Sequence, residues 1–171
     1  MAAIDEILLQ KAQAYASRHR ITLGSRLGFG IHGIVLVAGR PTESAKTAIK
    51  VHREQEPYCR ERDVYERLAQ RSVSEICGFH VPRLITCDES LWIIGMTIVT
   101  RPFVLDFAGA HLDRPPDFPE NIWEEWEQEK REQFGPQWTV VQRILASLET
   151  HGVFLVDVSP SNVAFLNEAV H

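Results

Sequence analysis

Apolar residues in the first third of the chain change from a helical to a strand-like spacing. Between residues 4 and 16 they recur every three or four positions, which predicts an amphipathic helix ending near residues 18–20. From Thr22 to His52 short β-rich runs replace this pattern, with a turn region at Gly39-Arg40-Pro41. We expect three antiparallel strands in this segment.

The next segment alternates again between helix and strand. Pro57 marks a boundary, and residues 58–71 are rich in helix formers with no internal Gly or Pro. Two apolar runs, 81–85 and 91–99, predict strands that are separated by a polar turn at 87–90. The first hundred residues are therefore expected to form a five-stranded antiparallel sheet with one inserted helix.

The remaining residues predict a smaller and mainly helical part. Residues 101–119 are rich in Pro, Asp and Gly, which favours a connector and a lobe boundary. An acidic helix with a narrow apolar stripe is expected at 120–134, and a core helix at 140–148, before a strand-like run at 153–156. The expected fold class is α+β, with an N-terminal lobe at residues 1–100 and a shortened helical lobe at residues 101–171.

Composition and charge exclude several classes of function. A chain of 171 residues with 44% hydrophobic content buries a real core. The formal net charge of -5 argues against nucleic acid as the main partner. The three cysteines form no C-x-x-C pair, which favours a reducing, cytoplasmic setting. The sequence shows neither the basic start of a signal peptide nor an apolar run long enough to cross a bilayer, so we expect neither secretion nor a membrane span.

A glycine motif lies between two of the predicted strands. Gly28, Gly30, Gly33 and Val35 have the form G-x-G-x-x-G-x-V. A strand rather than a helix follows the motif, which argues against a dinucleotide-binding fold. Glycines in a hairpin let backbone amides approach phosphate groups without a side chain in the way, although an ordinary glycine-rich turn has the same letters.

Two charged residues sit at inward-facing positions of the elements that follow. Lys50 ends a strand of small and apolar residues, where its ammonium meets phosphates beneath the glycine turn or is simply exposed. Glu61 shares a helix face with the apolar Tyr65, whereas Asp63 and Glu66 project from other faces. Because an inward carboxylate is costly without a partner, we expect a Lys50–Glu61 ion pair.

These features, in this order and before an apolar strand, resemble the N-terminal lobe of the protein kinase family. The resemblance implies a protein-kinase-like fold that binds ATP with Mg²⁺, with a hinge near residues 98–101. By this likeness the site consists of Gly28, Gly30 and Gly33 over the phosphates, Val35 and Ala48 in the adenine slot, and Lys50 paired to Glu61.

The second half matches the family at one loop. Asp157 and Asn162 have the spacing D-x-x-x-x-N of the catalytic loop, which also suits an ordinary Asp turn with an Asn nearby. In the family such an aspartate accepts the proton of the attacking hydroxyl, and the asparagine ligates a metal ion. Leu155 and Val156 replace the usual His-Arg pair, and Ser159 stands where many members have a lysine.

The family's Asp-Phe-Gly metal ligand is the largest difference. It normally comes about a dozen residues beyond the catalytic asparagine, and the printed sequence reaches His171 first. Glu168 is the only acid after Asn162 and arrives too early. We therefore expect impaired phosphoryl transfer, or else a further segment of a longer protein that carries this carboxylate.

Three functions follow from this comparison. The first is an atypical phosphotransferase that uses Asp157 as base, acting on an acceptor that the sequence does not identify, with a protein substrate or partner among the options. The second is an inactive pseudokinase that senses nucleotide or serves as a scaffold. The third is an interaction protein that uses the helix with Trp123 and Trp126 as a contact surface and forms a homodimer.

Overall fold

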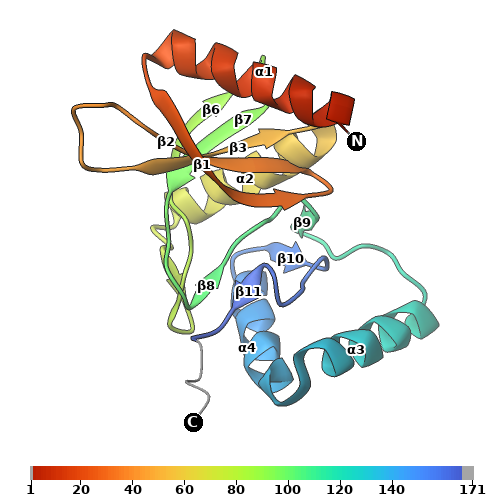
Figure 1. Ribbon diagram of the computed structural model, residues 1–171. Coiled ribbons are helices and arrows are strands. Elements are labelled where there is room, and N and C mark those ends of the chain that lie inside the picture. Colours follow the sequence, from red (N-terminus) through yellow and green to blue (C-terminus); the bar gives the residue numbers. More distant parts are fainter. Residues whose placement is uncertain (1, 167–171) are drawn as a thin grey trace.

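The computed structural model describes residues 2–166, with side chains from residue 5 onward (Figure 1). The elements in chain order are α1 (Ala2–His19), β1 (Thr22–Gly30), β2 (Gly33–Gly39), β3 (Thr47–His52), α2 (Gln55–Gln70), β4 (Glu75–Ile76), β5 (Phe79–His80), β6 (Leu84–Asp88), β7 (Ile93–Thr97), β8 (Phe103–Val104), β9 (Ala110–Leu112), α3 (Glu120–Phe134), a 3-10 turn (Gly135–Gln137), α4 (Trp138–Glu149), β10 (Val153–Leu155) and β11 (Val163–Ala164).

The predicted five-stranded sheet is confirmed. Its strands lie in the order β1-β2-β3-β7-β6, and each neighbouring pair is antiparallel. Helix α2 is inserted between β3 and β4 and begins at Gln55, earlier than predicted, so that Pro57 lies in its first turn. The N–H groups of a first turn have no intrahelical partner, and a proline therefore costs little there.

Strand β3 presents different residues to the two faces of the sheet. Ile49 and Val51 belong to an apolar cluster with α1, which covers one face (Figure 1). Ala48 belongs to the larger cluster that includes α2. Because side chains alternate along a strand, Lys50 and His52 share the face of Ala48 and point toward α2.

The second half of the chain contains more strand than predicted. Helices α3 and α4 occur where the spacing placed them, but the 101–119 connector carries β8 and β9. Strand β8 pairs with β11 in antiparallel fashion, and β9 pairs likewise with β10. These strands have only two or three residues and find their partners far along the chain, so they leave no local periodicity for a sequence pattern to reveal.

The apolar core is continuous between the two parts. The larger cluster joins Tyr65 and Leu68 of α2 to Phe107, and to Ile144 and Leu148 of α4. This shared core fixes the sheet relative to the segments that carry Asp157 and Asn162. Within residues 2–166, none of the helices combines the length and the apolar character that crossing a bilayer requires.

Candidate functional site

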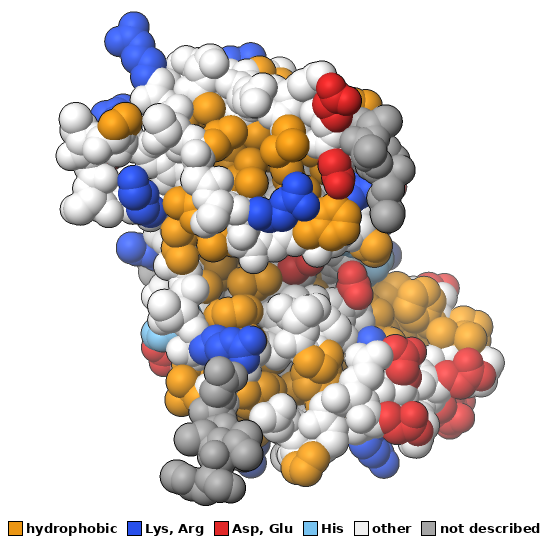
Figure 2. Space-filling model, viewed as in Figure 1, with side chains coloured by type: hydrophobic (Ala, Val, Ile, Leu, Met, Phe, Trp, Pro, Cys, Tyr) orange, Lys and Arg blue, Asp and Glu red, His pale blue; other side chains and the backbone are white. Residues whose placement is uncertain are grey.

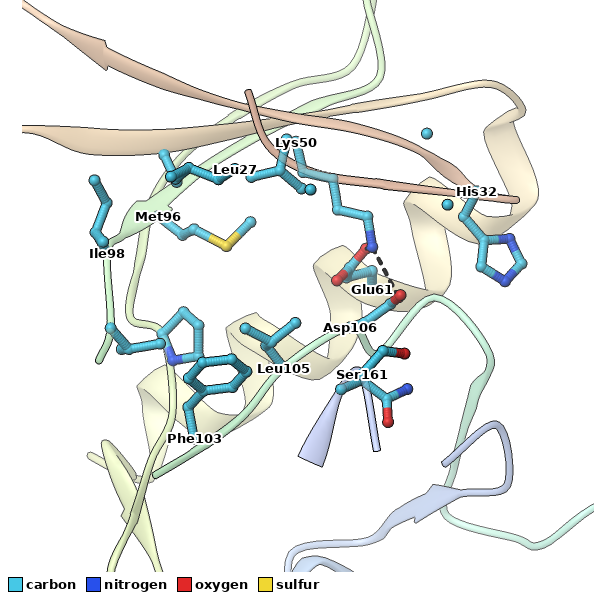
Figure 3. A pocket seen from close by; sticks show the side chains of 18 of the residues that line it. Leu27, His32, Lys50, Glu61, Met96, Ile98, Phe103, Leu105, Asp106 and Ser161 are labelled. Atoms are coloured by element: carbon cyan, nitrogen blue, oxygen red, sulfur yellow. Dashed lines mark hydrogen bonds and ion pairs between the residues drawn. The ribbon is translucent and has the colours of Figure 1, made fainter. Parts of the chain in front are cut away.

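A cavity of about 480 Å³ lies between the five-stranded sheet and the second half of the chain (Figure 3). This volume suits a small-molecule ligand. One end is apolar and lies beside the end of β7, and the other end holds charged groups. The lining includes Leu27, Gly28, Gly30, Gly33, Val35, Ala48, Lys50, Glu61, Met96, Ile98, Phe103, Leu105, Asp106, Ser161 and Asn162.

The glycine hairpin closes one side of this cavity. Gly30 and Gly33 pair with each other where β1 turns into β2. At Gly33, whose φ is 155°, an added Cβ would lie 1.9 Å from the backbone oxygen of Val51, so the fold itself requires glycine there. At Gly30 an added Cβ would meet nothing within 4 Å. Gly30 therefore leaves open space at the cavity, and packing does not explain its identity.

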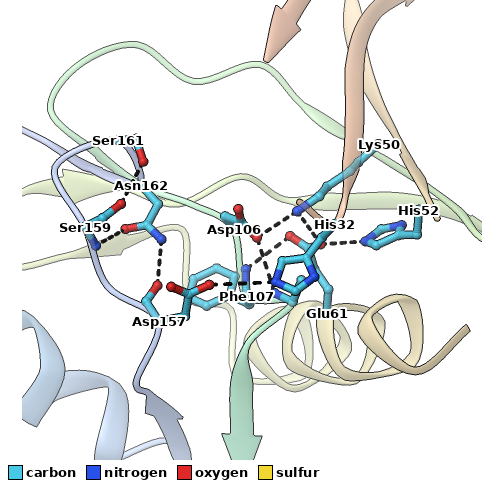
Figure 4. A network of polar contacts seen from close by, with 11 residues as sticks. His32, Lys50, His52, Glu61, Asp106, Phe107, Asp157, Ser159, Ser161 and Asn162 are labelled. Atoms are coloured by element: carbon cyan, nitrogen blue, oxygen red, sulfur yellow. Dashed lines mark hydrogen bonds and ion pairs between the residues drawn. The ribbon is translucent and has the colours of Figure 1, made fainter. Parts of the chain in front are cut away.

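The expected ion pair between Lys50 and Glu61 is present. Lys50 Nζ lies 2.7 Å from Glu61 Oε2 and 2.8 Å from Asp106 Oδ1, and the Lys50 and Glu61 side chains are almost completely buried (Figure 4). Burial acts to lower the pKa of Lys50, but the charges of Glu61 and Asp106 outweigh it and raise that pKa. Burial acts to raise the pKa of Glu61, yet Lys50 and His52 hold it at about 2. The site thus carries a fixed cation flanked by two carboxylates.

His52 is a member of this network that the sequence analysis did not select. Its Nε2 lies 2.7 Å from Glu61 Oε2, and its Nδ1 lies 3.1 Å from the backbone oxygen of Trp92. A carbonyl and an ionised carboxylate only accept hydrogen bonds, so both contacts are made when both ring nitrogens carry hydrogen. Glu61 Oε1 accepts a third hydrogen bond from Phe107 N at 3.1 Å. The Glu61 carboxylate is therefore fixed in position from three sides.

Asp106 is the most important residue that the sequence analysis missed. It follows β8 with a left-handed backbone (φ 70°), a conformation that Asp tolerates better than most residues, and its carboxylate points into the cavity (Figures 3 and 4). Because β8 pairs with β11, Leu105 N donates to Asn162 O at 2.9 Å. Asp106 thus lies beside the loop that ends at Asn162.

This position puts a carboxylate into the cavity that Asn162 also lines. Asp106-Phe107 precedes Asn162 by more than fifty positions, whereas the expected Asp-Phe-Gly segment follows the asparagine. The feature of the sequence that indicates Asp106 is the apolar run 103–105, which is followed directly by Asp-Phe. Glu168 lies outside the described residues.

Asn162 closes the Asp157 loop through its side chain. Its Oδ1 accepts from Ser159 N at 2.7 Å, and its Nδ2 donates to the backbone oxygen of Asp157 at 2.7 Å. The side chain of Asp157 is 54% exposed and does not line the cavity, but its Oδ2 lies 3.7 Å from Nε2 of His32 in the glycine hairpin. The structure therefore places Asn162 in the cavity and Asp157 at its mouth.

The remaining predicted residues belong to the same cavity. Gly28, Val35 and Ala48 line the cavity, and Ile98 stands at its apolar end. Within residues 2–166 there is no group of three or more His, Cys, Asp or Glu side chains that would hold a metal ion by itself.

Comparison with known proteins does not extend this description. No family model, no curated protein and no solved structure matches the chain. Its function therefore has to be argued from the geometry of the site.

Proposed function

We propose that this chain binds ATP together with Mg²⁺ in the cavity and acts as an atypical, kinase-like phosphotransferase. The observation that carries the proposal is the buried Lys50, held by Glu61 and Asp106 directly beneath a glycine hairpin. A buried ammonium with fixed geometry meets phosphate oxygens without first losing side-chain freedom.

The shape of the cavity supports one orientation of the nucleotide. Val35, Ala48 and Met96 line its apolar part and suit a flat aromatic base, with Leu105 on the opposite side (Figure 3). Lys50 and the glycine hairpin suit the phosphates. The base then lies near the end of β7 and the terminal phosphate near the mouth.

The residues present also fit Mg²⁺. This ion keeps several waters and phosphate oxygens and takes only one or two ligands from the protein, so a complete protein cage is not needed. The carboxylate of Asp106 is one third exposed, and Asn162 Oδ1 keeps a lone pair after accepting from Ser159 N. Asp106 and Asn162 would hold the ion, which when bound neutralises charge on the phosphates.

The order of these two residues along the chain differs from the family pattern, but their spatial relation compensates. In the family the acid comes on a strand that returns after the asparagine. Here the acid precedes the asparagine in the sequence: Asp106 follows β8, which runs antiparallel beside β11. This arrangement supports catalysis more strongly than the sequence alone suggested.

Asp157 is the candidate general base. Its exposed carboxylate is accessible to a hydroxyl group of an acceptor. It takes up the hydroxyl proton as that oxygen bonds to the terminal phosphorus of ATP, while the bond from this phosphorus to the bridging oxygen breaks and ADP leaves. Ser159 supplies no positive charge to the transferring group, so we expect slow turnover.

A nucleotide-binding pseudokinase is the second candidate. Two observations favour it: Asp157 lies outside the lining of the cavity, and no His-Arg pair precedes Asp157. In this case nucleotide binds but no phosphoryl group moves.

Two measurements separate these functions. ATP with Mg²⁺ at 100 times its dissociation constant should stabilise the chain by about 2.7 kcal/mol, which raises the melting temperature by roughly 5–10 °C. Lys50→Met should abolish most of this shift, and an unchanged shift in that variant would exclude the proposed site. Release or transfer of radiolabelled phosphate that is lost in Asp157→Ala supports the phosphotransferase, whereas binding without turnover selects the pseudokinase.

A further inference from the structure

A second cavity, of about 470 Å³, lies between α3, α4 and β10. It shares no lining residue with the candidate nucleotide cavity. Its walls include three of the four tryptophans of the chain, Trp123, Trp126 and Trp138. Val156, which directly precedes Asp157, also lines it. The cavity thus adjoins the start of the Asp157 loop.

The three indole rings form two corners rather than a stack. Trp123 and Trp126 have centroids 5.7 Å apart and planes at 85°, and Trp126 and Trp138 have centroids 5.9 Å apart and planes at 70°. Both pairs are edge-to-face contacts, and all three indoles line the cavity. Because the face of an indole carries negative charge density, such a corner attracts a cation with an apolar surface.

Two of the three rings are held in place by other contacts before any ligand arrives. Trp126 Nε1 donates to Val156 O at 2.9 Å, and Trp138 is only 5% exposed and stacks on Phe134. A preformed corner loses little conformational freedom on binding.

Charge around the cavity points to the same class of ligand. Glu127 and Glu149 line it, and α3 carries six glutamates against only Lys130 and Arg131. Figure 2 shows hydrophobic side chains beside acidic ones in the region of α3. Glu127 already pairs with Arg131, while Glu149 makes no ion pair or side-chain hydrogen bond with the residues that the structure describes. The Glu149 carboxylate is therefore the free negative group at the rim.

We propose that this second cavity binds a small organic cation of the trimethylammonium type. Its methyl groups contact the tryptophan corner, and its charge is balanced by Glu149 and by the field of α3. The site requires no nucleotide, so the inference stands independently of ATP binding.

Choline and its neutral isostere 3,3-dimethylbutan-1-ol test this inference, because they differ in charge but hardly in shape. The indole ¹H–¹⁵N signals of the protein without nucleotide are recorded during titration with each compound. Choline should shift the signals of Trp123, Trp126 and Trp138, while that of Trp92, which lies on the other half of the chain beneath Lys11, serves as an internal control. The neutral alcohol should bind at least about tenfold more weakly, as expected for loss of a desolvated cation–π contact.

Matched variants locate the site. Trp126→Leu should weaken choline binding about tenfold. Glu149→Gln should weaken it roughly two- to fivefold, whereas Glu125→Gln, an exposed acid of α3 that does not line the cavity, should leave it unchanged. The Glu149→Gln and Glu125→Gln pair answers the question even where Trp126→Leu folds poorly.

Three outcomes would overturn the inference. They are equal affinity for choline and the neutral alcohol, no shift of the three indole signals at millimolar choline, and identical binding by Glu149→Gln and Glu125→Gln. A concentration-dependent dimer in light scattering that choline does not dissociate would assign the cavity to a second copy of the chain instead.

Discussion

Replacement of Glu61 by glutamine removes the carboxylate on which the polar network depends while preserving side-chain size. Glu61 is fully buried between Lys50 and His52 and also accepts a hydrogen bond from Phe107 N. In the variant, Lys50 keeps Asp106 as a partner, and the glutamine oxygen still accepts from Phe107 N. The expected effect is therefore a partial loss of the network rather than its collapse.

Two routes give the same magnitude for this loss. A carboxyl group whose pKa falls from 4.5 to about 2 contributes on the order of 3 kcal/mol to stability in its ionised form, since one pH unit corresponds to about 1.4 kcal/mol. Removing one partner of a buried ion pair costs about 3–5 kcal/mol of stability. Because Lys50 keeps Asp106 as a partner, we expect a value at the lower end of this range. We expect a free energy of unfolding lower by about 3 kcal/mol and a melting temperature lower by roughly 6–12 °C.

Urea unfolding followed by tryptophan fluorescence between pH 2 and pH 7 measures this difference. The pKa of Glu61 is lowered by folding, so its contribution is complete above about pH 4.5 and is lost as the pH falls toward 2. The gap between the wild type and Glu61→Gln should therefore be widest at neutral pH and close in acid. Glu66→Gln, on an exposed position of the same helix, should change stability by less than about 0.5 kcal/mol. Equal stabilities of the two variants, or a gap that does not narrow in acid, would refute this reasoning.

Other residues give further predictions. Gly33→Ala should lower the free energy of unfolding by more than about 2 kcal/mol, because the added Cβ collides with the backbone of Val51. Gly30→Ala should change that free energy by less than about 0.5 kcal/mol, because its added Cβ meets nothing. Thermal melts of the two variants measure the difference. Folding raises the pKa of Lys50, so the contribution of the Lys50 charge to stability is complete below about pH 10 and is lost only at higher pH. If the wild type lost stability near pH 8 and Lys50→Met did not, this prediction would be wrong.

The parts of the site that were predictable from sequence rest on regular periodicity. Lys50 and Glu61 each occupy the apolar face of an element with a clear repeat, two residues in β3 and 3.6 in α2, so both were expected to point inward and to meet. His52 shares the repeat of Lys50 and was detectable by the same reasoning.

Asp106 could not be placed in this way. Strands β8 and β9 are too short to show a repeat, and their partners lie in the last twenty described residues of the chain. The direction of the Asp106 side chain depends on a left-handed backbone angle that no pattern of hydrophobic residues encodes.

The most direct test of the account is calorimetric titration of ATP with and without Mg²⁺ into the wild type, Asp106→Asn and Asp117→Asn. Asp117 is an exposed acid of the segment before α3 and provides the same change of charge away from the cavity. Mg²⁺ should strengthen ATP binding by the wild type and by Asp117→Asn. In Asp106→Asn, ATP alone should bind at least as tightly, because a negative charge near the phosphates is gone, but the gain from Mg²⁺ should be lost. An undiminished gain from Mg²⁺ in Asp106→Asn would contradict the assignment of this carboxylate.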